Sequence, residues 1–182
     1  VLDGVDTVSI APHKFYGLNG SGLLIKKKGI IIEPQIHGGA STTPYRSGTP
    51  ALGLAVSIEK ALELALEHQA ERVAYVRELN GRLRAALAKY PAVRVNSPAD
   101  AVPHILNLSV SGVMGTAFQK ALAEQGVCVS VKSACSVEGT PSKAVYAVSR
   151  DRKNALSSWR ISLSPLTTEA ELAEFLQIFD RC

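Results

Sequence analysis

The residue with the clearest chemical potential is Lys14, in the run Ala-Pro-His-Lys-Phe-Tyr-Gly at residues 11–17. It follows a strand-like alternation over residues 5–10 and precedes a glycine-rich turn over residues 17–22. A lysine amine becomes nucleophilic when it is desolvated or crowded by other cations, and it can then form a Schiff base. His13 places an aromatic ring beside it. The alternative interpretation is a solvated surface lysine in a loop after a strand.

A second polar group combines His37 and its two following glycines with the sequence Arg-Ser-Gly-Thr-Pro at residues 46–50. Glycines let the backbone approach a ligand closely, and a hydroxyl with an arginine suits a phosphate or carboxylate. A helical pattern begins just after Pro50, and anions are favoured at helix N-termini. The alternative is a capping loop with Thr49 as N-cap and Pro50 at the first helical position, which is compatible with anion binding.

The cysteines lie in different surroundings. Cys128 belongs to the apolar alternation of residues 127–129, which predicts a buried strand residue. Cys135 follows that strand in a loop of small polar residues near Lys132, and a neighbouring cation favours the reactive thiolate. A structural or incidental loop cysteine is the alternative. Three cysteines at unrelated spacings, the last being Cys182, indicate neither a disulfide framework nor a zinc site.

A strand-like alternation also surrounds Arg160. Trp159, Ile161 and Leu163 fall on one face of this segment, whereas Arg160 falls on the other. An arginine on the polar face of a strand can bind a carboxylate through two parallel hydrogen bonds. The alternative is a surface arginine on an edge strand.

Together these four stretches resemble the C-terminal half of the cysteine desulfurases, pyridoxal-phosphate enzymes of the class V aminotransferase group, and they occur in the family's order. The resemblance covers the whole chain. It implies an α/β structure, the C-terminal half of a fold-type I transferase. Residues 1–68 would be a remnant of the cofactor-binding large domain, and residues 69–182 a C-terminal small α/β domain.

The resemblance also implies a role for each motif. His13 and Lys14 match the family's cofactor-binding histidine–lysine pair, in which the lysine carries the cofactor. Thr49 matches a threonine that binds the cofactor phosphate of the partner subunit. Cys135 matches the cysteine that receives sulfur as a persulfide, and Arg160 matches the arginine that holds the substrate carboxylate.

The implied reaction converts L-cysteine to L-alanine with pyridoxal 5'-phosphate as cofactor. Sulfur passes from the persulfide to an acceptor protein, either for iron–sulfur cluster assembly or for thiolated RNA, and the family implies a cytoplasmic homodimer. One alternative is a selenocysteine lyase or a class V aminotransferase, in which Cys135 would be incidental. Another is a non-catalytic fragment that folds, dimerises or binds acceptor proteins.

The chain departs from the family pattern at several positions. Ala11 stands where the family usually has a phosphate-binding serine, and residues 39–42 read Gly-Ala-Ser-Thr without the usual third glycine and acidic residue. Residues 164–166 read Ser-Pro-Leu in place of a glycine-containing stretch. The family's N-terminal half, with the aspartate for the cofactor ring nitrogen and the stacking histidine, has no counterpart. We therefore expect a truncated chain that is inactive alone.

The bulk composition is that of a globular protein. The 182 residues are 46% hydrophobic and 20% charged, with a formal net charge of +4. No apolar run approaches the roughly 20 residues that span a bilayer, so no membrane association is expected. The one basic cluster, residues 26–28, has no interleaved aromatic residues, and direct nucleic-acid binding is therefore not expected.

Hydrophobic periodicity predicts alternating strands and helices with a boundary near His68. The predicted strands lie at residues 5–10, 21–26, 30–33, 93–95, 105–110, 127–131 and 157–164. The predicted helices begin at Pro50, run through residues 73–87 and 116–124, and include a short one from Pro141. Thr168 and Glu171 predict a capping box for a last amphipathic helix.

Overall fold

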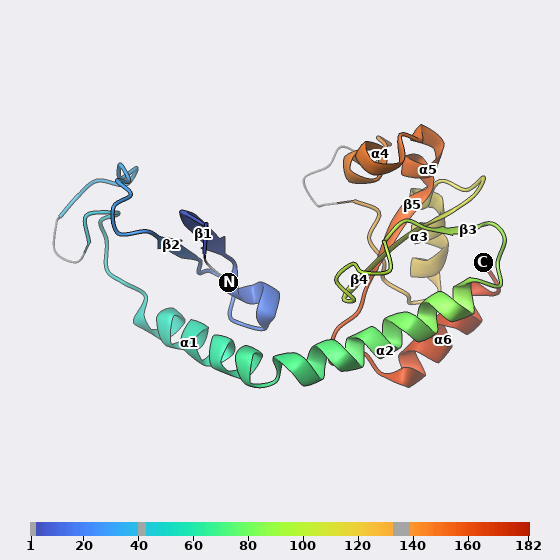
Figure 1. Cartoon of the computed structure of the whole chain (residues 1–182), viewed down its shortest axis with the longest axis horizontal. Coiled ribbons are helices and arrows are strands. Elements are labelled where there is room, and N and C mark those ends of the chain that lie inside the picture. Colours follow the sequence, from blue (N-terminus) through green and yellow to red (C-terminus); the bar gives the residue numbers. More distant parts are fainter. Residues whose placement is uncertain (1–2, 40–42, 133–138) are drawn as a thin grey trace. The chain divides into compact units, whose positions relative to one another are not determined.

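The computed structural model of the chain describes residues 3–39, 43–132 and 139–182. The chain divides into two compact units, Val1–Gln69 and Ala70–Cys182. Figure 1 shows their elements in sequence colours, with the first unit in blue to cyan and the second in green to red. Within the described residues, no helix combines the length and the apolar character that crossing a bilayer requires.

The first unit is built on a two-stranded sheet. Strand β1 (Thr7–Ile10) pairs antiparallel with β2 (Leu23–Lys26), so that Thr7 lies opposite Lys26. The 3-10 helix η1 (Pro12–Phe15) lies between the two strands in sequence. The strand predicted at residues 30–33 is wrong, since this segment forms no ladder and Ile31 is 96% exposed. An apolar run becomes a strand only when another strand pairs with it, and here none does.

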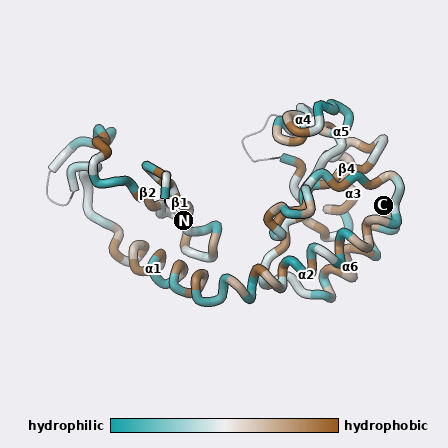
Figure 2. Tube along the Cα trace, viewed as in Figure 1, coloured by the Kyte–Doolittle hydropathy of each residue, from teal (hydrophilic) through white to brown (hydrophobic). Residues whose placement is uncertain are grey.

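Helix α1 (Leu52–Glu67) begins later than its sequence suggests. Its N-cap residue is Ala51, and no side chain caps it. The alternative interpretation, with Thr49 as N-cap and Pro50 at the first helical position, is therefore wrong. The Leu52 amide bonds back to the Pro50 carbonyl at 3.1 Å, a tight turn that displaces the helix start. Only Ile58 of this helix is buried, although hydrophobic residues recur along its length in Figure 2.

The second unit places helices around a three-stranded antiparallel sheet. Its strand order is β3 (Val93–Val95), β4 (Ile105–Val110) and β5 (Ser158–Ser162). Helix α2 (Gln69–Leu87) lies beside the C-terminal helix α6 (Glu169–Phe179), and α3 (Gly115–Glu124) packs against the sheet (Figure 1). The predicted capping box of α6 is confirmed, with Thr168 and Glu171 bonded to each other.

The core of the second unit surrounds a fully buried Trp159. Its ring stacks on Phe118 with centroids 5.1 Å apart, and Phe175 and Phe179 pack nearby. Such aromatic pairs stabilise a core by more than the apolar area that they bury. The alternation predicted around Arg160 is confirmed, because Trp159, Ile161 and Leu163 are all buried. The remaining core side chains come from α2, β4, α3 and α6: Val76, Leu79, Leu83, Leu87, Leu106, Leu108, Leu122, Leu172 and Ile178.

The predicted strand at residues 127–131 and the predicted burial of Cys128 are both wrong. Residues 127–131 form no regular strand, because a single bridge between Ser130 and Arg160 joins them to the sheet. Cys128 is consequently exposed and not buried. Helix α4 (Lys143–Ser149) starts after its N-cap Ser142, just beyond Pro141, and the short helix α5 (Arg152–Ser157) was not predicted.

Candidate functional site

A tight turn presents Lys14 at the end of β1. The Lys14 amide bonds to the Ala11 carbonyl at 3.0 Å, and the Gly17 amide bonds to the Pro12 carbonyl at 2.9 Å. A Cβ atom at Gly17 would lie 2.8 Å from the Pro12 Cβ, so only glycine fits there. Tyr16 closes the turn in the left-handed conformation, with φ of 70°. The sequence therefore fixes the backbone that carries the lysine.

The side chains of His13 and Lys14 are exposed. Among the described residues, the Lys14 amine makes no hydrogen bond and no ion pair. In the same unit the Lys27 ammonium forms an ion pair with the Asp6 carboxylate at 2.8 Å, so Lys27 differs from Lys14 in having an anionic partner. An amine without a local acceptor is available to a carbonyl ligand.

Ser21 is a polar residue that sequence reasoning missed. Its hydroxyl is buried and has no hydrogen-bond partner within the described structure. It directly precedes Gly22, where a Cβ would lie 3.6 Å from the Ile10 carbonyl, so Ser21 belongs to the same end of the sheet as η1. A buried hydroxyl without a partner is costly unless a ligand or water supplies one. No motif marked this serine, because its burial depends on the folded turn.

The second polar group of the first unit folds into one loop. The Ser47 amide bonds to the Ile36 carbonyl at 3.2 Å. A Cβ at Gly38 would lie 2.7 Å from the Ser47 hydroxyl, so the first glycine after His37 packs directly on the Arg-Ser-Gly-Thr segment. Gly48 has φ of +114°, a conformation that other residues rarely adopt. The exposed Thr49 hydroxyl makes no hydrogen bond to any described residue and is available to a ligand.

Arg160 lies in the middle of β5, between two neighbouring segments. It is opposite Asn107 of β4, and on the other edge it exchanges backbone hydrogen bonds with Ser130 at 2.6 and 3.1 Å. Its side chain is half-buried, and its Nε atom is buried without a partner among the described residues. Burying a guanidinium nitrogen without an acceptor costs free energy, and a carboxylate would supply that acceptor.

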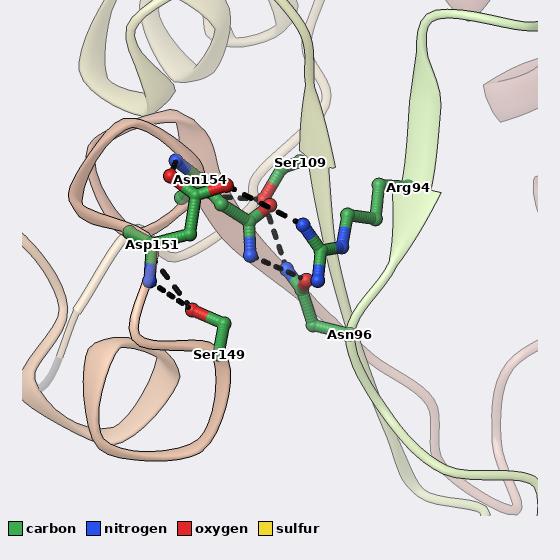
Figure 3. A network of polar contacts seen from close by, with 6 residues as sticks. All are labelled: Arg94, Asn96, Ser109, Ser149, Asp151 and Asn154. Carbon is green, nitrogen blue, oxygen red and sulfur yellow. Dashed lines mark hydrogen bonds and ion pairs between the residues drawn. The ribbon is translucent and has the colours of Figure 1, made fainter.

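A polar network braces the chain just before β5 (Figure 3). The side-chain Nδ2 of Asn154 donates to Asn96 Oδ1 at 2.9 Å, and Asn96 Nδ2 donates to the Ser109 hydroxyl at 2.8 Å. The Ser109 hydroxyl returns a 3.0 Å hydrogen bond to the Asn154 carbonyl. The Asp151 carboxylate caps α5 by accepting a hydrogen bond from the backbone N–H of Asn154, and it also forms an ion pair with Arg94 at 3.5 Å. The network joins β3 and β4 to α5, the short helix that directly precedes β5 and therefore the strand that carries Arg160.

Cys135 lies outside the described residues. The described residues on either side of its segment are joined, because the Lys132 ammonium donates to the Thr140 carbonyl at 2.6 Å and to its hydroxyl at 3.1 Å. The predicted site residues therefore fall into separate groups. His13, Lys14 and Thr49 belong to the first unit, and Arg160 belongs to the second.

Among the described residues, no cluster of three histidine, cysteine or acidic side chains could hold a metal ion.

The sequence profile of the aminotransferase class-V family matches residues 3–175. The chain belongs to this family.

Relatives of the chain are about twice its length. A cysteine desulfurase IscS of Clostridium botulinum is 33% identical over 182 residues, covering 97% of this chain and 46% of the relative. A NifS/IcsS protein homolog of Lactobacillus delbrueckii is 32% identical over 179 residues, with the same coverage. A solved NifS-like protein superposes with a TM-score of 0.87 at 30% identity, over 98% of this chain and 46% of that one. The predicted fold class, part of an α/β fold-type I transferase, is confirmed by this likeness.

Proposed function

We propose that this chain carries the cofactor lysine, the sulfur-accepting thiol and the substrate arginine of a cysteine desulfurase. The observation that supports it best is the Lys14 amine, exposed and unpaired among the described residues at the end of a rigid turn. The family supplies the chemical context, because class V aminotransferases and cysteine desulfurases depend on pyridoxal phosphate. The reaction is the conversion of L-cysteine to L-alanine with transfer of sulfur to Cys135.

The residues of the first unit fit the cofactor. Lys14 provides an amine for its aldehyde, His13 provides an adjacent ring, and Thr49 provides a hydroxyl for its phosphate. The unpartnered Ser21 hydroxyl supports this fit, since Ala11 offers no such group. When bound, pyridoxal phosphate supplies an aldehyde and an electron sink. These residues bind and orient it, and the Lys14 amine moves a proton at the substrate carbon.

The residues of the second unit act on the substrate. Arg160 holds the L-cysteine carboxylate, which satisfies its buried Nε atom. The Cys135 thiolate attacks the substrate sulfur, so that a sulfur–sulfur bond forms while the carbon–sulfur bond breaks. A proton replaces sulfur on the carbon, and L-alanine leaves. The enzyme retains a persulfide for an acceptor protein, and no external oxidant or reductant is needed.

We assign the two parts of the chain to different domains. Residues 1–68 belong to the cofactor-binding domain, and residues 69–182 form the small α/β domain. The assembled enzyme is a cytoplasmic homodimer in which Thr49 serves the cofactor phosphate of the partner subunit. Its sulfur acceptor is a protein, with iron–sulfur cluster assembly as the destination that the IscS name of a relative suggests.

The proposal is tested by reductive labelling in a chimera. The chain replaces the matching half of the Clostridium botulinum relative, and the protein is incubated with pyridoxal phosphate and borohydride. Peptide mass spectrometry should find the cofactor on Lys14, and Lys14→Ala should abolish labelling. Lys28→Ala, at another exposed lysine, is the matched control and should change nothing. Labelling spread over several lysines, or unchanged in Lys14→Ala, would contradict the assignment. The 182-residue chain alone is expected to give no turnover.

A further inference from the structure

The ammonium of Lys26, at the end of β2, organises the turn that follows the strand. Lys26 Nζ donates to the Ile30 carbonyl at 2.9 Å and to the Lys27 carbonyl at 3.2 Å. The Ile30 amide bonds back to the Lys27 carbonyl at 3.1 Å and closes the same turn. Lys26 is half-buried, whereas Lys27 and Lys28 are exposed. The first lysine of the basic cluster is therefore held in place by the backbone of its own turn.

The same ammonium also contacts the loop that carries Thr49. Lys26 Nζ lies over the face of the Tyr45 ring, 5.2 Å from its centroid. A cation in this position is attracted by the electrons of the ring face. Tyr45 directly precedes the Arg-Ser-Gly-Thr segment at residues 46–49. The contact therefore joins the end of β2 to this segment.

The loop has contacts of its own that shape it locally. The Tyr45 amide bonds to the Thr43 hydroxyl at 3.2 Å, and the Ser47 amide bonds to the Ile36 carbonyl at 3.2 Å. Both hydrogen bonds join residues of the loop to each other, so they do not fix the loop against the sheet. The Tyr45 ring on the Lys26 ammonium supplies a link of that kind.

This link lies at the end of the β1–β2 ladder that is away from Lys14. Thr7 pairs with Lys26 at this end, whereas η1, which carries Lys14, follows the other end of β1. Lys26 thus contacts the Thr49 loop at the opposite end of the ladder from the Lys14 turn. This separation supports a role for Thr49 at the cofactor of the partner subunit.

We propose that Lys26 is a positioning residue for the cofactor phosphate: it holds the segment of residues 46–49 through the face of the Tyr45 ring, and thereby fixes the Thr49 hydroxyl. Lys26 acts through Tyr45 and does not itself bind the cofactor. The role requires a cation at position 26 and an aromatic ring at position 45, but not the Tyr45 hydroxyl. This inference rests on the proposed function, from which it takes the phosphate-binding role of Thr49.

The test measures how much the phosphate contributes to cofactor binding in the chimera with the Clostridium botulinum relative. Equilibrium dialysis gives apparent dissociation constants for pyridoxal phosphate and for pyridoxal, which lacks the phosphate. Lys26→Met removes the charge from a side chain of similar length, and it should weaken pyridoxal phosphate about two- to five-fold, as expected for one cation–π contact. Pyridoxal affinity should not change. Lys26→Arg keeps a cation and should bind both ligands as the parent does.

Variants of Tyr45 test the same contact from its other side, independently of the turn that Lys26 closes. Tyr45→Leu removes the ring and should weaken pyridoxal phosphate about as much as Lys26→Met, whereas Tyr45→Phe keeps the ring and should match the parent. The double variant Lys26→Met, Tyr45→Leu should be no weaker than the weaker single variant, because both substitutions remove one contact. Lys28→Met, at an exposed neighbouring lysine, is the control and should change nothing.

Three results would overturn the proposal. The first is parent-like affinity for pyridoxal phosphate in Lys26→Met and Tyr45→Leu. The second is an equal loss of pyridoxal affinity, which would mean a general structural defect, and the third is a loss in Tyr45→Phe as large as in Tyr45→Leu. If the parent chimera binds no cofactor at Lys14, the proposed function fails and this inference fails with it. If Lys14 is labelled and the variants bind as the parent does, this inference alone fails.

Discussion

The two units of the chain differ in whether their apolar side chains are buried: most of those in α1 are exposed, whereas those of the second unit form a core. In the described part of the first unit, Ile58 is the only large hydrophobic residue that joins the buried set, while Leu52, Val56 and Leu66 of α1 are more than 60% exposed. In the second unit, α2, α3 and α6 close over the sheet, and Trp159 is fully buried. A short ladder and one amphipathic helix cannot bury their own hydrophobic faces. The second unit therefore contains its own core, whereas the first requires apolar contacts that it does not supply.

Expressing the two units as separate proteins should change folding more than any substitution below. We expect residues 70–182 to unfold in a single cooperative urea transition, because their core is complete. Residues 1–69 should show no cooperative transition, because an isolated two-stranded ladder is marginal in water. Circular dichroism and amide chemical-shift dispersion measure both. A cooperative transition in residues 1–69 alone would remove the contrast between the units.

A matched pair of leucine truncations sharpens the contrast within the intact chain. Leu83→Ala in α2 removes a fully buried side chain and should cost about 2–5 kcal/mol of unfolding free energy. Leu66→Ala in α1 removes a side chain that is 63% exposed, and it should change stability by at most about 0.5 kcal/mol. Urea unfolding of each variant gives the comparison. Equal losses would mean that α1 is packed as well as α2.

The polar network around Asn154 should contribute less to the free energy of unfolding than the apolar core does. Asn154→Ala removes the donor to Asn96 Oδ1, and it leaves this acceptor unsatisfied in a part-buried position. We expect a loss of about 1–3 kcal/mol in residues 70–182, measured by urea unfolding. Lys153→Ala, at the exposed neighbouring position, is the control and should be neutral. A neutral Asn154→Ala would show that water replaces the network without cost.

The capping box of α6 should give the smallest effect, and it should depend on pH. Thr168→Ala should cost about 1 kcal/mol at neutral pH, as expected for the loss of an N-cap. The folded-state pKa of Glu171 is lowered by hydrogen bonds from Thr168. Its stabilisation is therefore present above the unfolded pKa and is lost as pH falls through the folded pKa. Thermal unfolding between neutral and acidic pH should show less acid sensitivity in Glu171→Gln than in the parent.

Most elements of the second unit could be predicted from the sequence. The helical spacing that includes Leu79 and Leu83 and the alternation from Trp159 to Leu163 both report burial on one face, and both faces are buried. Residues 127–131 have the same alternation, yet only Ser130 pairs. Alternation indicates that a segment can pair, but it does not supply the partner strand. The same reason explains residues 30–33, where Ile31 stays in solvent.

The sequence predicts which residues of the candidate site could react, but it does not predict which of their polar atoms are buried without a partner. The turn that presents Lys14 follows from local chemistry, because Pro12 and Gly17 pack closely. The unpartnered Nε atom of Arg160 and the buried hydroxyl of Ser21 could not be predicted. They result from contacts between segments that are distant in sequence or from the burial of a whole turn. Cys135 was identified from its sequence motif and remains a prediction.

The amine of Lys14 and the thiol of Cys135 should act in one reaction. The peptide mass spectrum of the chimera after exposure to L-cysteine and pyridoxal phosphate tests this directly. We expect the Cys135 peptide to gain the mass of one sulfur atom, the Cys128 and Cys182 peptides to gain none, and Lys14→Ala to abolish the gain. Sulfur found on another cysteine, or sulfide released at the parent rate by Cys135→Ala, would contradict it.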